Sequence, residues 1–251
     1  MKTKIITLTT DFVSDLYVGQ MKGVILSINP EVKLIDLTHK IKSFNILETA
    51  FFIWQVCPSF PDETIHLIVV DPGVGSDRTA LIIRTKRHLY IGPNNGIFHF
   101  IEENQEVREV VKINTKAFKN SSATFQGKDI FAPLASLLST GRKMEKFGER
   151  VDKKIIEKLN LPEGCILYID DFGNIITNIK KEFSPGEKLT VMYKGKKVKV
   201  TFARTFSDVQ EGSYLVLKGS SGYLEIDKNK ASAAKALGAQ VGDKIGILKE
   251  S

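Results

Sequence analysis

Polar and acidic side chains follow the first three strands that the sequence predicts. Apolar, β-branched runs over residues 4–10, 32–37 and 64–70 predict these strands. Directly after them come Asp11, the pair Thr38-His39, and Asp71. Ligands of an open parallel sheet bind beyond the carboxyl ends of its strands, so these side chains are expected at one edge. Two carboxylates there can accept hydrogen bonds or a proton from a ligand. The alternative for either aspartate is a turn-capping role, and finding two together favours function.

The segment after the third predicted strand concentrates groups that can do chemistry. DPGVGSDR (71–78) combines the Asp71 carboxylate, a rigid turn, two glycines and Arg78. Glycines allow a ligand to approach the backbone closely. The segment is not a phosphate-binding loop, because the chain contains neither G-x-x-x-x-G-K-[ST] nor G-x-G-x-x-G. A ligand bound here therefore does not need phosphate groups.

Other polar segments have structural explanations that compete with a functional one. Residues 92–96 (GPNNG) form either a simple turn or a strand end whose amides, including Asn94, line the pocket. Asp129 is expected to cap a helix over 129–139. Hairpin turns explain residues 170–174 (DDFGN) and 219–223 (GSSGY) without any ligand.

Metal sites and side-chain nucleophiles are not expected. The four histidines, at positions 39, 66, 88 and 99, have no metal-binding spacing, and His66 and His88 fall within or at the start of strands. No G-x-S-x-G elbow occurs. Cys57 and Cys165 lie far apart in apolar runs, which predicts buried free thiols in a reducing compartment and excludes a cysteine zinc site.

The elements around these residues predict an α/β protein with two domains. In the first half, short β-branched runs alternate with helical patterns, such as one that begins after Asn45, as is typical of βα units around a largely parallel sheet. Residues 142–160 mix charges of both signs, which indicates a solvated helix or connector. Short strands punctuated by glycine follow and predict a small antiparallel barrel or sandwich. We expect domains over 1–150 and 164–251, joined by a linker over 151–163.

Composition excludes several classes of protein. The chain has 251 residues, of which 42% are hydrophobic and 26% charged, as in ordinary globular proteins. This excludes a disordered, collagen-like or membrane chain. The net charge of +7 is spread over both halves, so nucleic-acid binding is disfavoured. The apolar run 5–8 is too short for a signal peptide, and no stretch approaches a membrane span. A cytoplasmic location is expected.

Several segments, in order along nearly the whole chain, resemble the S-adenosyl-L-methionine hydroxide adenosyltransferase family. They are TTDF (9–12), VGQMKG (18–23), DPGVG (71–75), GPNNG (92–96), TF (124–125), DIFAP (129–133), DFGN (171–174) with TN (177–178), and SSGYL (220–224). This family is similar to the bacterial fluorinases and chlorinases, which attack the same substrate carbon with a halide. The resemblance implies an N-terminal Rossmann-like domain with a mostly parallel sheet, a C-terminal antiparallel β-barrel, and a homotrimer with active sites between subunits.

The reaction implied by the resemblance is attack of water or hydroxide on the ribose C5′ of S-adenosyl-L-methionine, giving adenosine and L-methionine without a cofactor. The leaving thioether is neutral, and the sulfonium charge is quenched during attack, so a dry, preorganised pocket accelerates the step. In the family an aspartate, an arginine and a histidine hold the water. Asp71 and Arg78 match the first two, whereas Gln126 stands at the histidine position. A glutamine amide can orient water but cannot exchange a proton.

Substrate contacts are also implied by the resemblance. Asp11 is expected to accept hydrogen bonds from the ribose hydroxyls, and Asn174 to contact adenine. Either Asp170 or Asp171 is expected to bind the methionine ammonium group. The remaining expected contacts are aromatic groups on the adenine or ribose and hydroxyls on the methionine carboxylate: Phe172, Phe206, Phe44, Ser220 and Ser221.

Two other functions compete with hydrolysis. Because of Gln126, a catalytically impaired protein that binds adenosine or S-adenosyl-L-methionine is one alternative. A halide-dependent synthase is the other, and it is disfavoured because the Asp71 carboxylate would repel an incoming anion in a desolvated site.

Overall fold

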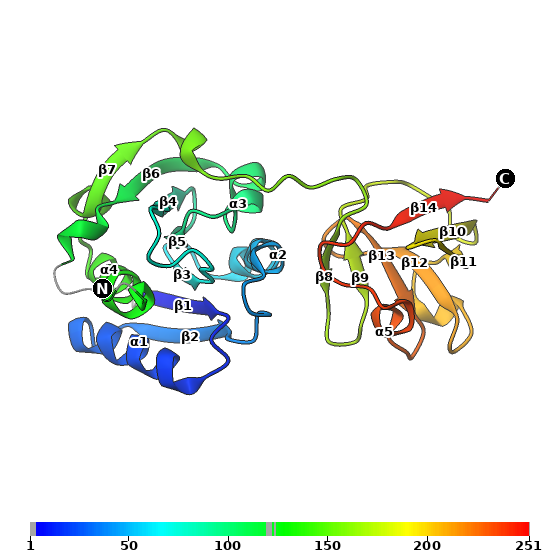
Figure 1. Ribbon diagram of the computed structural model, residues 1–251, viewed down its shortest axis with the longest axis horizontal. Coiled ribbons are helices and arrows are strands. Elements are labelled where there is room, and N and C mark those ends of the chain that lie inside the picture. Colours follow the sequence, from blue (N-terminus) through cyan, green and yellow to red (C-terminus); the bar gives the residue numbers. More distant parts are fainter. Residues whose placement is uncertain (1–3, 119–121, 123, 251) are drawn as a thin grey trace. The chain divides into compact units, whose positions relative to one another are not determined.

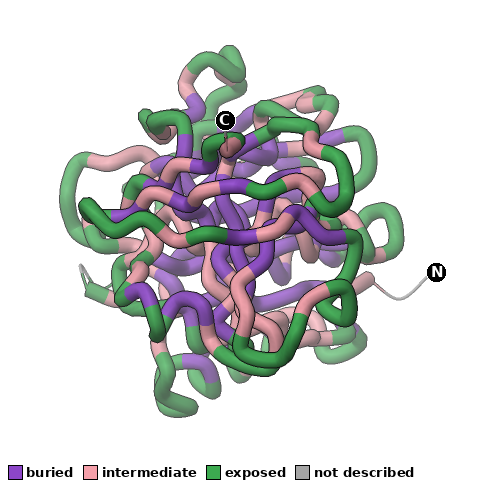
Figure 2. Tube along the Cα trace, turned by 90° about the vertical axis from the view of Figure 1, so that its right-hand side faces the viewer, coloured by how far each residue is buried: buried purple, intermediate pink, exposed green. Residues whose placement is uncertain are grey.

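The structure is a computed structural model that describes residues 4–118, 122 and 124–250. The chain divides between Leu159 and Asn160 into two compact units, each built around a mixed sheet with helices (Figure 1). The buried stretches of the chain lie mainly in strands and helices, and the outer loops of the trace are mostly exposed (Figure 2). Within the described residues, no helix is both long and apolar enough to cross a membrane.

The sheet of the first unit is half parallel and half antiparallel. Its strands in spatial order are β2 (Lys33–Thr38), β1 (Ile5–Thr10), β3 (Ile65–Val69), β5 (Leu89–Pro93), β4 (Ala80–Thr85), β6 (Val107–Ile113) and β7 (Gly148–Val151). Neighbours from β2 to β5 are parallel, and neighbours from β5 to β7 are antiparallel. The expectation of a mostly parallel sheet therefore holds only for its first half. Residues 86–88 join β4 to β5, and a connection this short permits only a hairpin.

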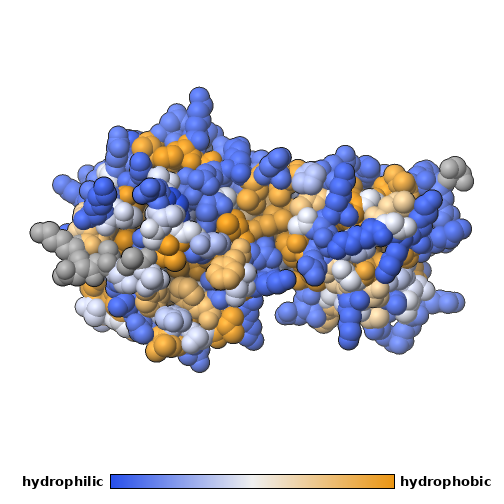
Figure 3. Space-filling model, viewed as in Figure 1, coloured by the Kyte–Doolittle hydropathy of each residue, from blue (hydrophilic) through white to orange (hydrophobic). Residues whose placement is uncertain are grey.

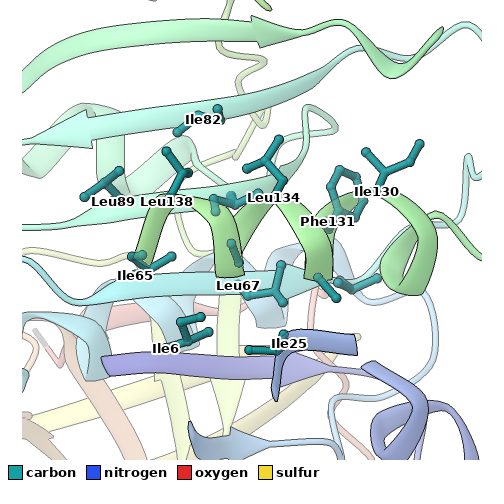
Figure 4. Packing of buried hydrophobic residues seen from close by; sticks show 14 of the residues in the cluster. Ile6, Ile25, Ile65, Leu67, Ile82, Leu89, Ile130, Phe131, Leu134 and Leu138 are labelled. Atoms are coloured by element: carbon teal, nitrogen blue, oxygen red, sulfur yellow. The ribbon is translucent and has the colours of Figure 1, made fainter. Parts of the chain in front are cut away.

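Helices cover both faces of this sheet. α1 (Asp15–Ile28) and α4 (Ala132–Ser139) pack on one face, and α2 (Ile46–Val56) and α3 (His99–Asn104) on the other. Neighbouring strand residues alternate between the two cores, so that Leu67 packs with Ile25 and Leu134 (Figure 4). Each such fully buried side chain contributes roughly 1.5–3 kcal/mol. Single turns of 3₁₀ helix complete the unit: η1 (Cys57–Ser59), η2 (Thr115–Ala117), η4 (Met144–Phe147) and η5 (Lys153–Ile155).

The second unit contains a mixed sheet that curls into a half-barrel. Its strands in spatial order are β14 (Gly246–Lys249), β10 (Lys188–Tyr193), β11 (Lys196–Phe202), β12 (Tyr214–Lys218), β13 (Leu224–Lys228), β9 (Ile175–Thr177) and β8 (Ile166–Ile169). The expected purely antiparallel pattern is wrong at one place, because β11 and β12 are parallel. Residues 203–213, which include the turn η6 (Phe206–Asp208), make the crossover that a parallel pair needs. An isolated bridge between Cys165 and Lys244 links segments next to the edge strands.

Among the described residues, one strand and two α-helices were not expected from the sequence. The charged stretch 142–160 contains β7, whose Glu149 and Arg150 are exposed at the sheet edge, where charged side chains discourage further strand pairing. α3 and α5 (Ala233–Leu237) are too short to show helical periodicity.

Hydrophilic residues cover much of the visible surface of each unit (Figure 3), which agrees with the dispersed charge of the sequence.

The two cysteines are buried free thiols, as predicted. Burial raises the pKa of the Cys57 thiol far above its ordinary value. A thiolate nucleophile at this position is therefore not available.

A pair of buried histidines makes the first unit sensitive to acid. The His66 and His88 rings lie with their centroids 5.0 Å apart, and His66 Nδ1 is 2.8 Å from Thr7 Oγ1. Burial lowers the pKa of His66 well below 6.5 and that of His88 to about 4. The unfolded state therefore binds more protons than the folded state below pH 6.5, and stability falls as the pH drops from there towards 4.

We expect His88→Gln to flatten this acid dependence, because it removes one imidazole that must stay neutral in the fold. Chemical unfolding followed between pH 7 and pH 4 measures the effect. Lys86→Gln, at an exposed position in the same turn, is the matched control and should keep the wild-type slope. If the free energy of unfolding fell equally steeply with pH in His88→Gln and the wild type, His88 would not be a source of the acid sensitivity.

Candidate active site

The carboxyl ends of three parallel strands bring the predicted polar residues to one edge of the first sheet. Asp11 follows β1, Thr38 ends β2, and Asp71 lies two residues after the end of β3, which confirms the predicted arrangement. A cavity of about 280 Å³ lies at this edge, near the lower end of the roughly 300–1,000 Å³ typical of small-molecule sites. It is lined by Asp11, Phe12, Tyr17, Ser43, Phe44, Val69, Asp71, Val74, Thr124, Phe125, Gln126 and Gly127.

Asp71 and Arg78 form a buried bidentate ion pair. Arg78 Nε donates to Asp71 Oδ1 at 2.6 Å, and Arg78 Nη2 donates to Asp71 Oδ2. The two side chains are only 6% and 9% exposed, respectively. The guanidinium carbon also lies 5.7 Å from the centroid of the Phe131 ring. Bidentate pairing fixes both groups in orientation as well as distance. The Asp71 side chain is therefore committed to Arg78 rather than to capping its own turn.

Gln126 completes this charged centre from a segment distant in the sequence. Arg78 Nη2 donates to Gln126 Oε1 at 2.7 Å. Gln126 immediately precedes a π-helical turn, η3 (Gly127–Phe131), which runs directly into α4. Such turns often occur at functional sites because they re-aim side chains.

The predicted capping role of Asp129 is wrong. The helical segment begins two residues before Asp129, so this residue lies inside its first turn. The Asp129 carboxylate instead accepts a hydrogen bond from the Ser122 amide at 2.7 Å and lies 3.2 Å from Lys128 Nζ.

The three side chains offer complementary hydrogen-bonding capacity to a small ligand such as water. Each Asp71 oxygen accepts from Arg78 and retains a further lone pair. Since Gln126 Oε1 faces Arg78, its amide nitrogen is left as the donor of that side chain. A water molecule can therefore donate to Asp71 while it accepts from the amide, an arrangement that orients a lone pair and assists loss of a proton.

Asp11 also lines the cavity and is tied to a second loop. Its Oδ2 accepts a hydrogen bond from the Phe44 amide at 2.9 Å. Phe44 has a φ of +68°, a left-handed conformation that is uncommon for a bulky residue and often marks functional sites. The Phe44 side chain is 69% exposed beside the cavity. Asp11 keeps its second oxygen for a ligand.

Three aromatic side chains that sequence reasoning did not select line the same cavity. Phe12, Tyr17 and Phe125 pack with ring centroids 5.1–5.8 Å apart. They give the cavity an apolar wall on which a flat ring can pack. Phe12 and Phe125 lie within the recognised motifs, but Tyr17 carried only the signal of an aromatic residue near the start of a helix.

Asn94 does not line this cavity. The side chain is buried, and its amide donates to Thr79 Oγ1 at 3.1 Å and to the Ile155 carbonyl at 2.8 Å. Its Oδ1 accepts from the Glu157 amide at 2.9 Å. These bonds anchor the segment after β7 to the end of β5. A substrate contact at Asn94 stays a prediction that its hydrogen bonds do not support.

In the second unit, Asp170 organises the loop between β8 and β9. Its Oδ1 accepts from the Phe172 and Asn174 amides at 3.0 and 2.9 Å, and its Oδ2 accepts from Asn174 Nδ2 at 2.9 Å. Gly173 has a φ of +83°, which closes the turn without side-chain strain. The turn leaves Asp171 and Phe172 exposed, the latter by 79%.

The other predicted contacts of the second unit lie in two further loops. Phe206 begins η6 and is 38% exposed. Ser220 and Ser221 lie between β12 and β13, where Ser221 Oγ accepts from the Tyr223 amide at 3.3 Å. All these positions lie in loops or turns, and their contacts with a substrate stay predictions.

Fold and site together define an α/β protein with a small-molecule cavity at a strand-end edge, lined by a carboxylate that is paired behind with a guanidinium. Two family models match the chain. The S-adenosyl-L-methionine hydroxide adenosyltransferase N-terminal domain matches residues 6–148, and the C-terminal domain of the same family matches residues 164–246. The chain belongs to the S-adenosyl-L-methionine hydroxide adenosyltransferase family.

Named relatives and solved structures agree with this assignment. The chain is 36% identical to an (R)-S-adenosyl-L-methionine hydrolase of Methanocaldococcus jannaschii, with 97% of this chain and 95% of the relative covered. It is 25% identical to a fluorinase of Nocardia brasiliensis, with 94% and 93% covered. A crystal structure of a conserved protein from Thermotoga maritima superposes with a TM-score of 0.88 at 34% identity, covering 97% of this chain and 99% of that one.

Proposed function

We propose that this protein hydrolyses S-adenosyl-L-methionine to adenosine and L-methionine by attack of water at the ribose C5′. The observation that carries the proposal is that Asp71 and Gln126, both held by the buried Arg78, line a cavity with an aromatic side. Relatives at 36% and 33% identity bear the name (R)-S-adenosyl-L-methionine hydrolase, which supports the same reaction.

In this reaction Asp71 accepts a hydrogen bond, and then the proton, from the attacking water. Arg78 holds the Asp71 carboxylate in place, and the Gln126 amide orients the water oxygen towards C5′. As the C–O bond forms, the C5′–S bond breaks and its electron pair neutralises the sulfonium. The departing thioether of methionine therefore needs no proton, and the only proton to be moved is that of the water.

The substrate contacts are part of the proposal. Asp11 binds the ribose hydroxyls and Phe44 closes over the sugar, and their hydrogen bond at 2.9 Å supports a shared role. In the second unit we assign Asn174, Phe172 and Phe206 to the adenine, Asp170 or Asp171 to the methionine ammonium, and Ser220 and Ser221 to its carboxylate.

We further propose a homotrimer with active sites at subunit interfaces, built on a Rossmann-like first domain and a β-barrel-like second domain. The parallel arrangement of β2, β1, β3 and β5 supports the first of these descriptions. Sedimentation or mass photometry of the purified chain measures the oligomeric state.

Incubation with S-adenosyl-L-methionine, followed by chromatography, tests the activity. We expect adenosine and L-methionine in equal amounts, with no dependence on halide. Binding of the substrate without any product between pH 6 and pH 10 would instead identify an impaired binding protein. Formation of 5′-chloro-5′-deoxyadenosine in chloride would identify a synthase.

Gln126→His is expected to raise kcat at pH 7.5 by about tenfold or more, because imidazole can accept the proton that an amide cannot. General-base assistance typically raises a rate by about 10²–10⁴-fold. The gain should shrink at pH 6, where the imidazole becomes protonated. The kcat–pH profile measures this. Gln126→Leu, which removes the orienting amide, provides the opposite comparison and should lower kcat. A folded Gln126→His variant without any gain would show that Asp71 alone handles the proton.

A further inference from the structure

One face of the second sheet carries a row of acidic and amide side chains. Asn174 pairs with Asp170 across the loop, since the Asp170 amide donates to the Asn174 carbonyl at 3.2 Å. Ile175 and Ile176 pair with Ile226 and Glu225 of β13, so the same register brings Asp227 opposite Asn174. Residues opposite one another across antiparallel strands share a face. The row is therefore Asp170, Asn174 and Asp227, and Glu225 lies two residues from Asp227 on the same face.

Glu225 also lies against the loop that holds Ser220 and Ser221. A Cβ added at Gly219 would overlap the Glu225 carboxyl group, so this carboxyl packs directly against the start of the loop. Glu225 thus lies between the two segments already proposed for the methionine part of the substrate, which are Asp170 and Asp171 on one side and the serine loop on the other.

Asp227 is buried without any partner. It is 0% exposed, and neither carboxyl oxygen forms a hydrogen bond with the rest of the described chain. Among residues 160–250, no lysine, arginine or histidine forms an ion pair with Asp170, Glu225 or Asp227. Burial, together with the neighbouring carboxylates, raises the pKa of Glu225 to about 7 and that of Asp227 to about 8. A bound cation would supply the missing counter-charge.

We infer that Glu225, backed by Asp227, joins Asp170 in binding the α-ammonium group of the substrate and so selects substrates that carry this group. The inference rests on the proposed function. Asp170 uses three of its acceptor positions within its own loop, so it has little capacity left for three ammonium N–H groups. Glu225 is half-buried and can supply an acceptor directly, while Asp227, two residues along the same strand, adds charge on the same face. An ammonium group suits acceptors spread along a row, because it donates in three directions.

The test compares two substrates. S-adenosyl-L-methionine carries the α-amino group, and its deaminated analogue lacks it. Losing one partner of a buried charged contact lowers binding affinity by about 30-fold or more. We therefore expect Glu225→Gln to lower kcat/KM for S-adenosyl-L-methionine by about this factor, mainly through KM, and to leave kcat/KM for the deaminated analogue unchanged. Asp227→Asn should act in the same direction with a smaller change.

Calorimetry provides a readout that does not need turnover. In an Asp71→Asn background, binding of S-adenosyl-L-methionine at pH 7 should release protons from Glu225 and Asp227, seen as a dependence on buffer ionisation enthalpy. Glu225→Gln should reduce this release. Glu182→Gln removes an exposed acid of the same unit, one that pairs with Lys218 at 2.6 Å, and should change neither readout.

Equal losses for both substrates, or no loss, in a folded Glu225→Gln variant would overturn the inference. Binding of magnesium or calcium alone that depends on Glu225 would also overturn it, in favour of a metal site. A wild type that binds substrate with proton release but forms no product would reject the proposed function while it supports the ammonium site.

Discussion

Asp71→Asn should lower kcat for hydrolysis of S-adenosyl-L-methionine by about 10³-fold, within the 10²–10⁴-fold range of general-base catalysis. Asparagine has nearly the shape of aspartate and can still accept one hydrogen bond from Arg78, but it cannot take a proton from water. KM should change little, because Asp11 and the aromatic wall are untouched. Adenosine release under saturating substrate measures the effect.

Asp77→Asn is the matched control for this variant. Asp77 lies in the same loop and is exposed, so its loss removes an equal charge without touching the pair. We expect wild-type kcat. An Asp71→Asn enzyme within tenfold of the wild type would require a different proton acceptor and would remove the central element of the proposed mechanism.

Arg78→Met is expected to lower both stability and activity. The substitution leaves the Asp71 carboxylate, which is only 6% exposed, without its partner. Breaking a buried ion pair typically costs about 3–5 kcal/mol. The free energy of unfolding should fall by about this amount. The loss of orientation at Asp71 and Gln126 should lower kcat by about 10²-fold or more.

The double variant Asp71→Asn/Arg78→Met separates the two effects. Removal of both charges should restore much of the stability, because no unpaired carboxylate is left, whereas activity should stay lost. Arg84→Met, which breaks an exposed pair with Glu63 at 3.4 Å, should cost no more than about 1 kcal/mol. If Arg78→Met were as mild as Arg84→Met in both measurements, the buried pair would not hold the site together.

Two residues of the site, Asp11 and Asp71, could be predicted from the rule that ligands bind beyond the carboxyl ends of parallel strands. Asp11 and Asp71 each follow an apolar β-branched strand, and parallel strands bring such positions to one edge whatever the loops do. Arg78 could be selected because it is close to Asp71 in the sequence. Gln126 could not be found this way, since it lies 48 residues from Arg78, and only the family resemblance identified it.

Other features depended on contacts that leave no local pattern. Asn94 resembles a pocket residue in sequence, but the segment after β7 folds back and uses all of its hydrogen-bonding groups. The hairpin between β4 and β5 and the parallel pair of β11 and β12 were missed because strand periodicity gives no direction of pairing. The row formed by Asp170, Asn174 and Asp227 likewise exists only through sheet register.

The acids Glu225 and Asp227 on that face also link substrate binding to the stability of the second unit. Because the pKa values of Glu225 and Asp227 are raised in the fold, the unfolded chain releases their protons first, and the empty unit loses stability as pH rises from about 4 towards 8. The buried imidazoles of the first unit act in the reverse sense. No single pH therefore gives both units of the unliganded chain their greatest stability. Near neutrality, an ammonium group bound at Glu225 and Asp227 would stabilise the second unit, whose stability is reduced at that pH.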